Sequence, residues 1–366
     1  MKRLLCLISS LNAGGAETFL MKVYRRLDRS RYQMDFCINV PQKCFYEEEI
    51  LSMGGRIYRI PTKSEDPMEF SRQLAQIIRS NGYEYVLRIT SNALGFWDLK
   101  IAKNAGARVC AARSSNSSDG GSWKSRIVHR LGGFLFTRYV DVKFAPSDLA
   151  AIHTFGKAAY ENGSVTILPN AVDLDIFHND EAARVRIRRE LGLKKDTLLV
   201  GHVGRFDTQK NHAFLLDIFC EIVNKQPKSK LLLVGNGTLE QQIRGKVRDM
   251  NLQDDVLFAG VRSDIPSVLS AMDVFVFPSF YEGMPNTVIE AQSTGLPCII
   301  ADTITRQADI TGLVQYFSLE DDPEIWADAA LKAAESPRKD TGRAFVEKKY
   351  DIQSTVDAFV RLCFQE

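Results

Sequence analysis

Short apolar runs alternate with helical patterns along almost the whole chain, and this alternation limits the possible folds more than any other feature. Most of the runs are continuously apolar, as expected for strands that are buried on both faces of a parallel sheet. The helical patterns between them supply the crossovers that parallel strands require. Strands are predicted at 3–10, 33–40, 85–90, 107–112, 142–147, 197–204, 230–235, 256–260, 274–279 and 296–302, and helices at 16–27, 70–80 and 213–226.

The strands fall into two series that divide near the Pro-Asn turn of ILPNAVDLDIF (167–177). A chain of 366 residues is also long enough for two domains with separate cores. We therefore expect two doubly wound α/β domains, 1–168 and 169–345, and a C-terminal helix within 346–366 that packs back on the first domain. Ligands of such sheets bind beyond the carboxyl ends of the strands, so the two domains would face each other across a ligand-binding cleft.

The cysteines and the N-terminus indicate the cellular compartment. Seven cysteines are scattered singly without a CxxC pair, which fits a reducing cytosol better than a disulfide framework or a zinc site. The apolar run in MKRLLCLISS is short and leads into a glycine loop, so it predicts a first strand rather than a signal peptide. No stretch reaches the roughly 18–20 apolar residues of a membrane span. These features predict a cytoplasmic protein, soluble or peripheral.

Charge is unevenly distributed along the chain. Residues 1–168 carry 24 Lys and Arg against 15 Asp and Glu, a net charge of +9, and the remainder carries −7. The basic residues are densest between 99 and 143, and the segment WKSRIVHRLGGFLFTRY (123–139) mixes them with aromatic residues. This segment fits either an interface with anionic lipid headgroups or a solvated basic surface over core residues. No recognition helix or RNA-binding signature accompanies the charge, so we expect no nucleic-acid partner.

The segment PSFYEGMPNTVIEAQSTGLPCII (278–300) carries two carboxylates, Glu282 and Glu290, in an otherwise apolar run. It predicts a strand, a loop and a helix, because Pro285 suits the first helical position and Gly295 the position just past the end. Glu282 would then lie in the loop before the helix, and Glu290 about a turn and a half into it.

The backbone between these carboxylates would form an anion site. Residues 283–287 would make the helix N-terminus, with free N–H groups and the positive end of the dipole. A carboxylate on either side can accept hydrogen bonds from vicinal hydroxyls. A sugar nucleotide has this layout, with a diphosphate between a hexose and a ribose. Either glutamate alone is more often a helix cap or a surface pair, so the whole pattern is what favours a ligand site.

The pattern E-G-x-P-N-x-x-x-E-A-x-x-x-G-x-P after a buried strand resembles the E-x7-E region of the family 4 glycosyltransferases, which are retaining enzymes of the GT-B fold. The resemblance implies that Glu282 binds hydroxyls of the donor hexose and that Glu290 binds the ribose. It also implies that the donor phosphates meet the backbone of the intervening residues, which are Gly283, Met284, Pro285, Asn286 and Thr287.

Other segments extend the resemblance. VGRFDTQKN supplies Arg205 and Lys210, and an Arg and a Lys on one loop can neutralise a diphosphate leaving group, although Arg-x4-Lys alone is usually surface charge. By resemblance, Arg205, Lys210 and Glu282 are the candidate catalytic residues. Further donor-binding candidates are Gly14 and Gly15 in NAGGAE (12–17), and Val261 and Arg262 in VLFAGVRSDIP (256–266), where the family contacts the base.

One stretch departs from the family pattern. Many relatives have H-S-H-N after the strand equivalent to ARVCAA, and this chain has Arg113, Ser114, Ser115 and Asn116 instead. Serine can donate or accept a hydrogen bond but cannot carry charge near neutral pH. Either another group takes the histidine's role, or sugar specificity differs, or activity is reduced. Arg113, Ser115 and Asn116 remain candidates for the acceptor or hexose vicinity.

No metal site is predicted. Asp173, Leu174 and Asp175 read D-x-D, but they lie beside the division between the domains, where an Asp-rich turn is the usual explanation. No other cluster has ligand spacing, so we expect metal-independent turnover. His202 lies in a predicted buried strand and is expected to be a packed core residue.

The resemblance spans nearly the whole chain and is closest in appearance to bacterial enzymes of capsule and exopolysaccharide synthesis. It implies transfer of a hexose or N-acetylhexosamine from a nucleotide sugar in the second domain, with UDP favoured over GDP. The acceptor would be a hydroxyl of a lipid-linked saccharide bound by the first domain at the membrane surface. One alternative is a non-catalytic sugar-nucleotide-binding subunit. A nicotinamide-dependent oxidoreductase is disfavoured, because SSLNAGGAE is not the required GxGxxG fingerprint.

Overall fold

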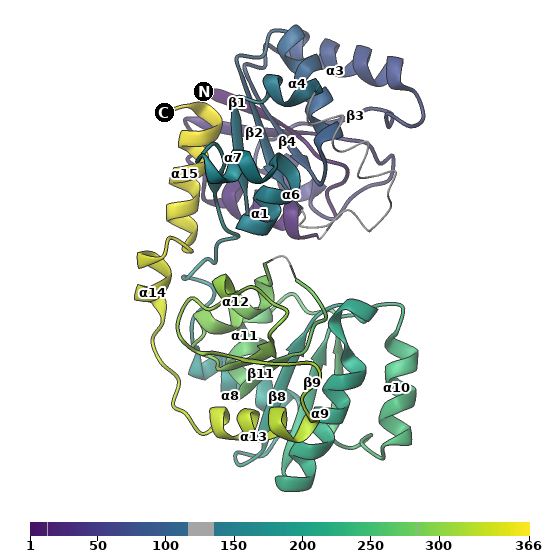
Figure 1. The fold of residues 1–366 in the computed structure, drawn as a ribbon, viewed down its shortest axis with the longest axis vertical. Coiled ribbons are helices and arrows are strands. Elements are labelled where there is room, and N and C mark those ends of the chain that lie inside the picture. Colours follow the sequence, from purple (N-terminus) through teal and green to yellow (C-terminus); the bar gives the residue numbers. More distant parts are fainter. Residues whose placement is uncertain (13, 116–134, 283) are drawn as a thin grey trace. The chain divides into compact units, whose positions relative to one another are not determined.

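The computed structural model describes residues 1–12, 14–115, 135–282 and 284–366. These residues form two compact units (Figure 1). The first unit contains Met1–Ala171 together with Ile352–Glu366, and the second contains Val172–Asp351. The first unit is therefore assembled from two segments that are separated by the whole of the second.

The first unit is built on a seven-stranded parallel sheet with the order β3-β2-β1-β4-β5-β6-β7. Its strands are β1 (Lys2–Leu7), β2 (Tyr32–Ile38), β3 (Ile57–Arg59), β4 (Tyr85–Thr90), β5 (Val109–Ser114), β6 (Val142–Ala145) and β7 (Thr166–Ile167). The strand order reverses between β1 and β4. Loops that leave these two strands diverge, which makes their carboxyl ends the expected ligand position in this sheet.

Helices cover both faces of the first sheet, and β1 shows why its sequence is continuously apolar. Leu4 and Cys6 pack in a core with α1 (Gly15–Arg26) and α15 (Ile352–Phe364), whereas Leu5 and Leu7 pack on the opposite face with α3 (Pro67–Asn81) and α4 (Phe96–Asn104). The remaining helices of the unit are α2 (Glu47–Ser52), α3 (Pro67–Asn81), α4 (Phe96–Asn104), α6 (Asp148–Phe155) and α7 (Lys157–Glu161), with short η1 (Ala93–Gly95) and η2 (Thr137–Tyr139).

Helix α15 belongs to the core of the first unit although it follows the second unit in sequence. Its Phe359 ring lies 6.3 Å from the ring of Phe19 on α1 and 6.3 Å from that of Phe144 on β6. Phe364 lies 4.7 Å from Tyr32, again between ring centroids. Aromatic pairs at these separations stabilise a core beyond the area that they bury.

The second unit repeats the arrangement with six parallel strands in the order β10-β9-β8-β11-β12-β13. They are β8 (Leu198–Val203), β9 (Ser229–Val234), β10 (Val256–Gly260), β11 (Val274–Phe277), β12 (Cys298–Ala301) and β13 (Val314–Phe317). The helices are α8 (Glu181–Glu190), α9 (His212–Lys225), α10 (Glu240–Asp249), α11 (Ile265–Ala271), α12 (Asn286–Ser293), α13 (Pro323–Ala334) and α14 (Gly342–Glu347), with η3 (Thr208–Lys210) and η4 (Arg306–Ala308). Here the order reverses between β8 and β11.

Asp273 connects three elements of the second unit at the start of β11. Its carboxylate accepts hydrogen bonds from Arg184 at 2.5 Å and Arg188 at 3.2 Å, both on α8, and from the backbone N–H of Leu199 on β8 at 2.7 Å. The single carboxylate thus holds β8, β11 and α8 in register at the amino ends of the two central strands.

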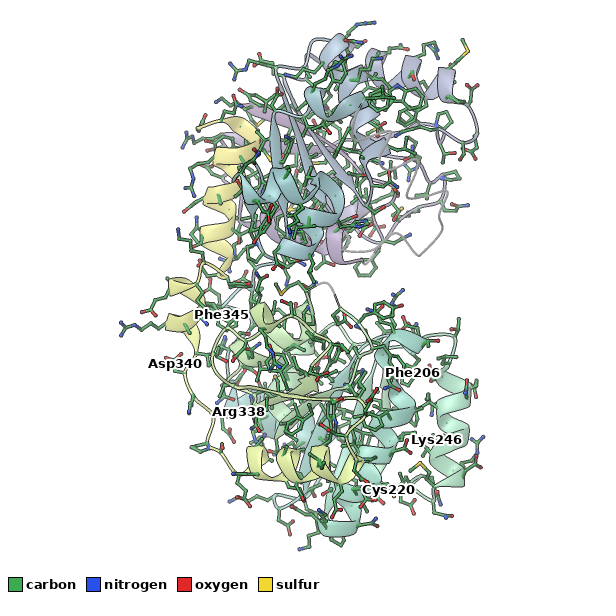
Figure 2. All side chains as sticks on the ribbon, viewed as in Figure 1. Phe206, Cys220, Lys246, Arg338, Asp340 and Phe345 are labelled. Carbon is green, nitrogen blue, oxygen red and sulfur yellow. The ribbon has the colours of Figure 1, made fainter. Side chains whose placement is uncertain are left out.

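A half-buried arginine, Arg338, lies at the same end of the unit. Arg338, labelled in Figure 2, donates to the carbonyl oxygens of Leu269 at 3.0 Å and Thr294 at 2.7 Å, near the C-terminal ends of α11 and α12. Burial lowers the pKa of Arg338 to about 10. The guanidinium satisfies carbonyls that a helix end leaves without an intrahelical partner.

The prediction of two parallel α/β sheets is confirmed, and every predicted strand is present with somewhat different ends. Three strands, β3, β7 and β13, are not predicted, because they have two to four residues at the sheet edges and no continuous run of buried side chains. All seven cysteines are free thiols. Over the described ranges, no helix combines the length and the apolar character that crossing a membrane requires.

Candidate active site

Two loops meet at the reversal point of the second sheet. One follows β8 and contains residues 204–211, and the other follows β11 and contains the described part of 278–285. The backbone N–H of Phe280 donates to the carbonyl of Gln209 at 2.9 Å, and the Gln209 side chain donates to the carbonyl of Tyr281 at 2.8 Å. These two bonds fix one loop against the other.

An ion pair joins the same two loops. Lys210 Nζ lies 2.5 Å from Glu282 Oε1, with the two side chains only 15% and 9% exposed. The ammonium also lies 4.7 Å from the centroid of the Phe277 ring at the end of β11. The structure therefore brings together two of the three predicted catalytic residues, which are 72 positions apart in sequence.

Two buried histidines lie beneath Lys210. The ring of His202 on β8 lies 4.7 Å from that of His212, and His212 stacks on Phe206 at 4.3 Å. His202 Nδ1 is 2.9 Å from the Val276 carbonyl, so this nitrogen carries the proton. Burial lowers the pKa of His212 to about 4 and that of His202 well below its usual value. Both rings are neutral near pH 7, so of these three side chains Lys210 is the one that carries a positive charge. His202 is buried in the core, as predicted.

Gly204 makes room for this arrangement at the end of β8. A Cβ atom at Gly204 would lie 3.0 Å from His202 Nε2 and 3.3 Å from the Lys210 stem. A side chain at this position would require His202 or the lysine stem to shift by a few tenths of an ångström.

The other predicted cations lie apart from the ion pair. Arg205 is 77% exposed, with its guanidinium 3.3 Å from Asp207. Arg262 binds two carboxylates, Asp264 at 2.7 Å and Glu190 at 2.6 Å. Arg205 is thus available to a ligand, whereas the charge of Arg262 is already neutralised within the unit. Val261 next to it is largely exposed.

Helix α12 begins at Asn286, so the prediction of Pro285 as its first helical residue is wrong by one position. Pro285 has ψ 94°, which is extended rather than helical, and its carbonyl accepts the first helical bonds from Val288 at 3.1 Å and Ile289 at 3.2 Å. Gly295 follows the helix with φ +69°, as predicted for the residue just past its end.

The remaining predicted donor residues of this segment are distributed over the loop and the helix. Asn286 and Thr287 form the first turn of α12, and Glu290 lies half-buried on its second turn. Met284 packs against the core of the second unit. Gly283 lies outside the described residues.

In the first unit, Gly14 and Gly15 form the start of α1, with Gly14 in an extended conformation as the residue before the helix. Ser115 follows β5 and lines a cavity that is described below. Asn116 lies outside the described residues. The predicted site residues of the first unit thus come to the carboxyl ends of β1 and β5, which lie on either side of β4.

Arg113 has an unusual environment. It lies within β5 and is buried, with its guanidinium 3.7 Å from the centroid of the Phe19 ring. Its hydrogen bonds go to uncharged oxygens, Asn170 Oδ1 at 2.6 Å and the Ser114 carbonyl at 3.4 Å. Burial lowers the pKa of this arginine to about 9. Arg113 is therefore part of the domain interior and adds nothing to the basic surface in which the sequence places it.

Asp173 and Asp175 form a turn, in which the Asp175 N–H donates to Asp173 Oδ1 at 3.2 Å. Among residues 1–12, 14–115, 135–282 and 284–366, no group of three or more histidine, cysteine, aspartate and glutamate side chains is placed to hold a metal ion.

Comparison with known proteins gives one match confined to the second unit and another that covers almost the whole chain. The family described as "Glycosyl transferases group 1" matches residues 197–336, which cover most of the second unit. EpsF of Bacillus subtilis, named provisionally as a glycosyltransferase, is 36% identical over 371 residues, which cover 99% of this chain and 96% of EpsF. The UDP-Gal:alpha-D-GlcNAc-diphosphoundecaprenol alpha-1,3-galactosyltransferase of Escherichia coli is 40% identical over 141 residues, 38% of this chain and 36% of the relative.

Solved structures show the fold. HepE of Anabaena in complex with UDP-glucose superposes with a TM-score of 0.80 at 16% identity, with full coverage of both chains. WaaG, a glycosyltransferase involved in lipopolysaccharide biosynthesis, gives a TM-score of 0.69 at 13% identity over 99% of each chain. These likenesses confirm the predicted GT-B fold with its two Rossmann-like domains.

Proposed function

The chain belongs to the group 1 glycosyltransferases, and from this premise we propose that it transfers a hexose or N-acetylhexosamine from a UDP-sugar to a lipid-linked saccharide. We further propose that it acts with retention at the anomeric carbon, as a family 4 enzyme of cell-surface polysaccharide synthesis. The observation that carries the proposal is the Lys210–Glu282 ion pair at the reversal point of the second sheet.

The proposed roles follow from the chemistry of each side chain. Glu282 accepts hydrogen bonds from hydroxyls of the donor hexose, and Glu290 accepts them from the ribose. Lys210 and the exposed Arg205 neutralise the diphosphate, whose charge grows as the sugar leaves. The start of α12 offers backbone N–H groups to the same phosphates. Gly14, Gly15, Val261 and Arg262 remain predicted donor-binding residues.

The reaction needs no nucleophile from the protein. The bond between the anomeric carbon and the phosphate oxygen breaks, and the acceptor oxygen bonds to that carbon on the same face. The proton of the acceptor hydroxyl passes to the departing phosphate oxygen. Lys210 stabilises this oxygen while it carries the additional charge. The proposed chemistry requires no metal ion, and the Asp173–Asp175 turn is assigned no role in it.

The relatives support the choice of donor and acceptor. HepE is solved with UDP-glucose, and the Escherichia coli relative is named for a UDP-galactose donor and an acceptor on a diphosphoundecaprenol carrier. GDP is the second choice of nucleotide. By this proposal the second unit binds the donor and the first unit binds the acceptor, at the cytoplasmic face of the cell membrane.

Nucleotide release from a panel of UDP-, GDP- and ADP-sugars tests the donor site. One UDP-sugar should release UDP slowly without acceptor, and excess EDTA should not change the rate.

Glu282→Ala should slow release about 10- to 100-fold and spare UDP affinity, because a lost hydrogen bond to a charged group costs about 1.5–3 kcal/mol. Glu290→Ala should weaken UDP binding about tenfold for the same reason.

The exposed Glu320 gives a matched control, since Glu320→Ala removes the same charge from a residue of the second unit that belongs to neither loop. Unchanged kinetics in both site variants would show that the site is assigned to the wrong residues. Rescue by magnesium or manganese after EDTA would contradict metal independence. If sugar nucleotide binds but is never turned over, even with a lipid-linked acceptor, the chain is instead a non-catalytic binding subunit.

We also propose that the first unit meets anionic lipid headgroups through its basic region. In the described part of that region, Lys100 lies 5.7 Å from the Phe136 ring and Arg138 lies 5.0 Å from the Tyr139 ring. Basic groups beside aromatic rings are typical of interfacial segments. Residues 123–134 of the predicted segment lie outside the described residues. Sedimentation with vesicles should show binding to anionic but not neutral lipid, and equal binding to both would contradict the proposal.

A further inference from the structure

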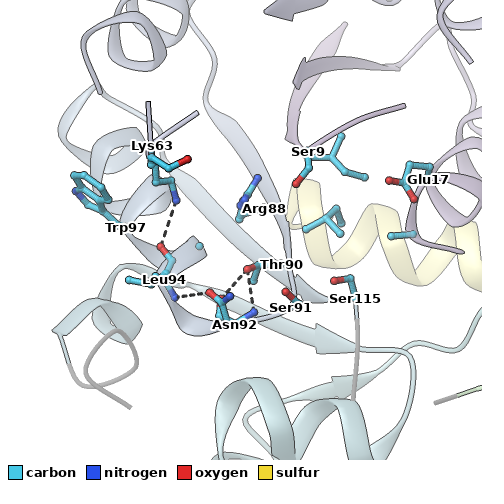
Figure 3. A pocket seen from close by; sticks show the side chains of 15 residues that line it. Ser9, Glu17, Lys63, Arg88, Thr90, Ser91, Asn92, Leu94, Trp97 and Ser115 are labelled. Atoms are coloured by element: carbon cyan, nitrogen blue, oxygen red, sulfur yellow. Dashed lines mark hydrogen bonds between the residues drawn. The ribbon is translucent and has the colours of Figure 1, made fainter. Parts of the chain in front are cut away.

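A cavity of about 520 Å³ lies at the reversal point of the first sheet (Figure 3). It is formed beyond the carboxyl ends of β1, β4 and β5, by residues that include Ser9, Thr90, Asn92 and Ser115. The position corresponds to that of the Lys210–Glu282 pair in the second sheet, and ligands of doubly wound sheets bind at this point. None of the roles proposed above accounts for the charged residues of this cavity.

Two cations of the cavity share one buried carboxylate. Lys63 Nζ lies 2.5 Å from Asp98 Oδ1, and Arg88 Nε lies 3.0 Å from Asp98 Oδ2. Asp98 is buried, whereas the side chains of Lys63 and Arg88 are 24% and 13% exposed. The cluster contains two cations and one carboxylate, so it carries a net charge of +1. The exposed parts of Lys63 and Arg88 line the cavity.

The geometry of Arg88 leaves part of its guanidinium available. Its Nε lies 3.0 Å from Asp98 without the geometry of a hydrogen bond, and no nitrogen of this guanidinium hydrogen-bonds to any other side chain or carbonyl of the described residues. A planar fork of N–H groups of this kind can bind a carboxylate or a phosphate through two parallel bonds. Burial lowers the pKa of the Lys63 ammonium. The negative charge of Asp98 partly offsets this decrease, and the positive charge of Arg88 increases it. An additional anion near Lys63 would therefore be stabilising.

The two ends of the cavity differ in chemistry. Figure 3 shows Lys63 and Trp97 at one end, Glu17 at the other, and Arg88 between them. Lys63 Nζ lies 5.7 Å from the centroid of the Trp97 ring, so this ammonium and the aromatic ring share one end. The Thr90 hydroxyl holds the loop by bonding to the Asn92 backbone. The side chains of Asn92 and Ser115 can bind sugar hydroxyls, and the Glu17 carboxylate would repel an anion from the far end.

We propose that this cavity binds a saccharide bearing an anionic group, with the anion on Lys63 and Arg88 and the sugar ring against Trp97. The inference rests on the proposed function, because it identifies this saccharide as the acceptor. The anionic group is a phosphate or diphosphate at the reducing end of a carrier-linked sugar, or the carboxylate of a uronic acid. Both offer the paired oxygens that an arginine fork binds.

Calorimetric titration of the whole chain with three small glucosides tests the site. The probes are methyl α-glucoside, methyl α-glucuronide and α-glucose 1-phosphate, which are neutral, carboxylate-bearing and phosphate-bearing. Saturating UDP keeps the phosphate probe out of the donor site. An anionic probe should bind about tenfold or more tightly than the neutral one, because charge-assisted bonds are roughly twice as strong as neutral ones. The preferred anion identifies the source, a carrier phosphate or a uronate.

Variants connect that preference to the cluster. Arg88→Met should reduce the affinity for the anionic probe to that for the neutral probe. Arg72→Met is the matched control, because it removes an exposed arginine of α3 that pairs with Glu69 in the same unit. Trp97→Ala should weaken the binding of all three probes. This variant keeps the ion pairs with Asp98, so it tests the cavity even if Arg88→Met does not fold.

Two outcomes would overturn the inference. One is equal binding, or no binding, of neutral and anionic probes to the wild-type chain. The other is an equal loss in Arg88→Met and Arg72→Met, which would indicate the general charge of the unit rather than a site. Failure of UDP to bind would count against the proposed function alone, since the same titration without UDP still measures the cavity.

Discussion

Lys210→Met is expected to lower the rate of sugar transfer by about 10²- to 10³-fold, the usual effect of losing one preorganised donor to a developing charge. The ammonium is held between Glu282 at 2.5 Å and the Phe277 ring at 4.7 Å, so it is already in position before a ligand arrives. Methionine keeps most of the stem that packs beside Gly204 and removes only the charge and its hydrogen bonds. The measurement is kcat with the donor identified by the panel, together with the dissociation constant for UDP.

A double-mutant cycle separates two roles of this lysine. If Lys210 contacts the leaving diphosphate, Lys210→Met should lower kcat further in a Glu282→Gln background. If Lys210 only positions Glu282, Lys210→Met should cause no further decrease in kcat in the Glu282→Gln background. Lys246→Met is the matched control, since Lys246 on α10 (Figure 2) belongs to neither loop and pairs with Asp217 on α9 at 2.6 Å. A loss of less than tenfold for Lys210→Met alone would contradict a direct role.

Asp273→Ala is expected to destabilise the second unit by about 3–5 kcal/mol, because it leaves a buried cation without its partner. Arg188 is 9% exposed and loses its carboxylate, and the Leu199 N–H loses its acceptor. Asp273→Asn should cost less, since an amide oxygen can still accept from Leu199. The free energy of unfolding in urea, followed by intrinsic fluorescence, measures the effect.

Asp196 provides the matched control for Asp273. It also pairs with a lysine, Lys228, but both side chains are more than half exposed. Exposed pairs contribute about 0–1 kcal/mol, so Asp196→Ala should have little effect on the free energy of unfolding. A loss below about 1 kcal/mol for Asp273→Ala would mean that packing and the bonds from Arg184 and Arg188 to backbone carbonyls hold α8 in place without this carboxylate.

The sequence predicts the two sheets because strands buried on both faces leave a continuous apolar signature, as β1 does. It cannot predict β7, since two residues at a sheet edge leave no pattern. The order of the strands in each sheet cannot be predicted from the sequence pattern either, because it depends on which distant segments pair. The same limit applies to the Lys210–Glu282 ion pair, which no local spacing in the sequence shows.

Arg113 shows how a small error in a strand end changes the interpretation of a residue. The predicted strand stops at 112, which would leave Arg113 in a ligand-facing loop, but β5 continues to Ser114 and carries the arginine into the core. The Lys63–Arg88–Asp98 cluster was missed altogether. Its one signal is Arg88 itself, a charge in the middle of the otherwise apolar strand YVLRIT, since a buried strand rarely carries a charge without a partner.

The discontinuity of the first unit has a consequence for biosynthesis. All seven strands of its sheet precede Ala171, but α15, which covers one face of that sheet together with α1, lies at Ile352–Phe364. While the ribosome is still translating residues 172–351, the nascent first unit exposes the apolar surface that Phe359 and Phe364 later cover. Exposed surface of this kind is what chaperones bind and what promotes aggregation. The second unit, in contrast, can complete its own core without waiting for later sequence.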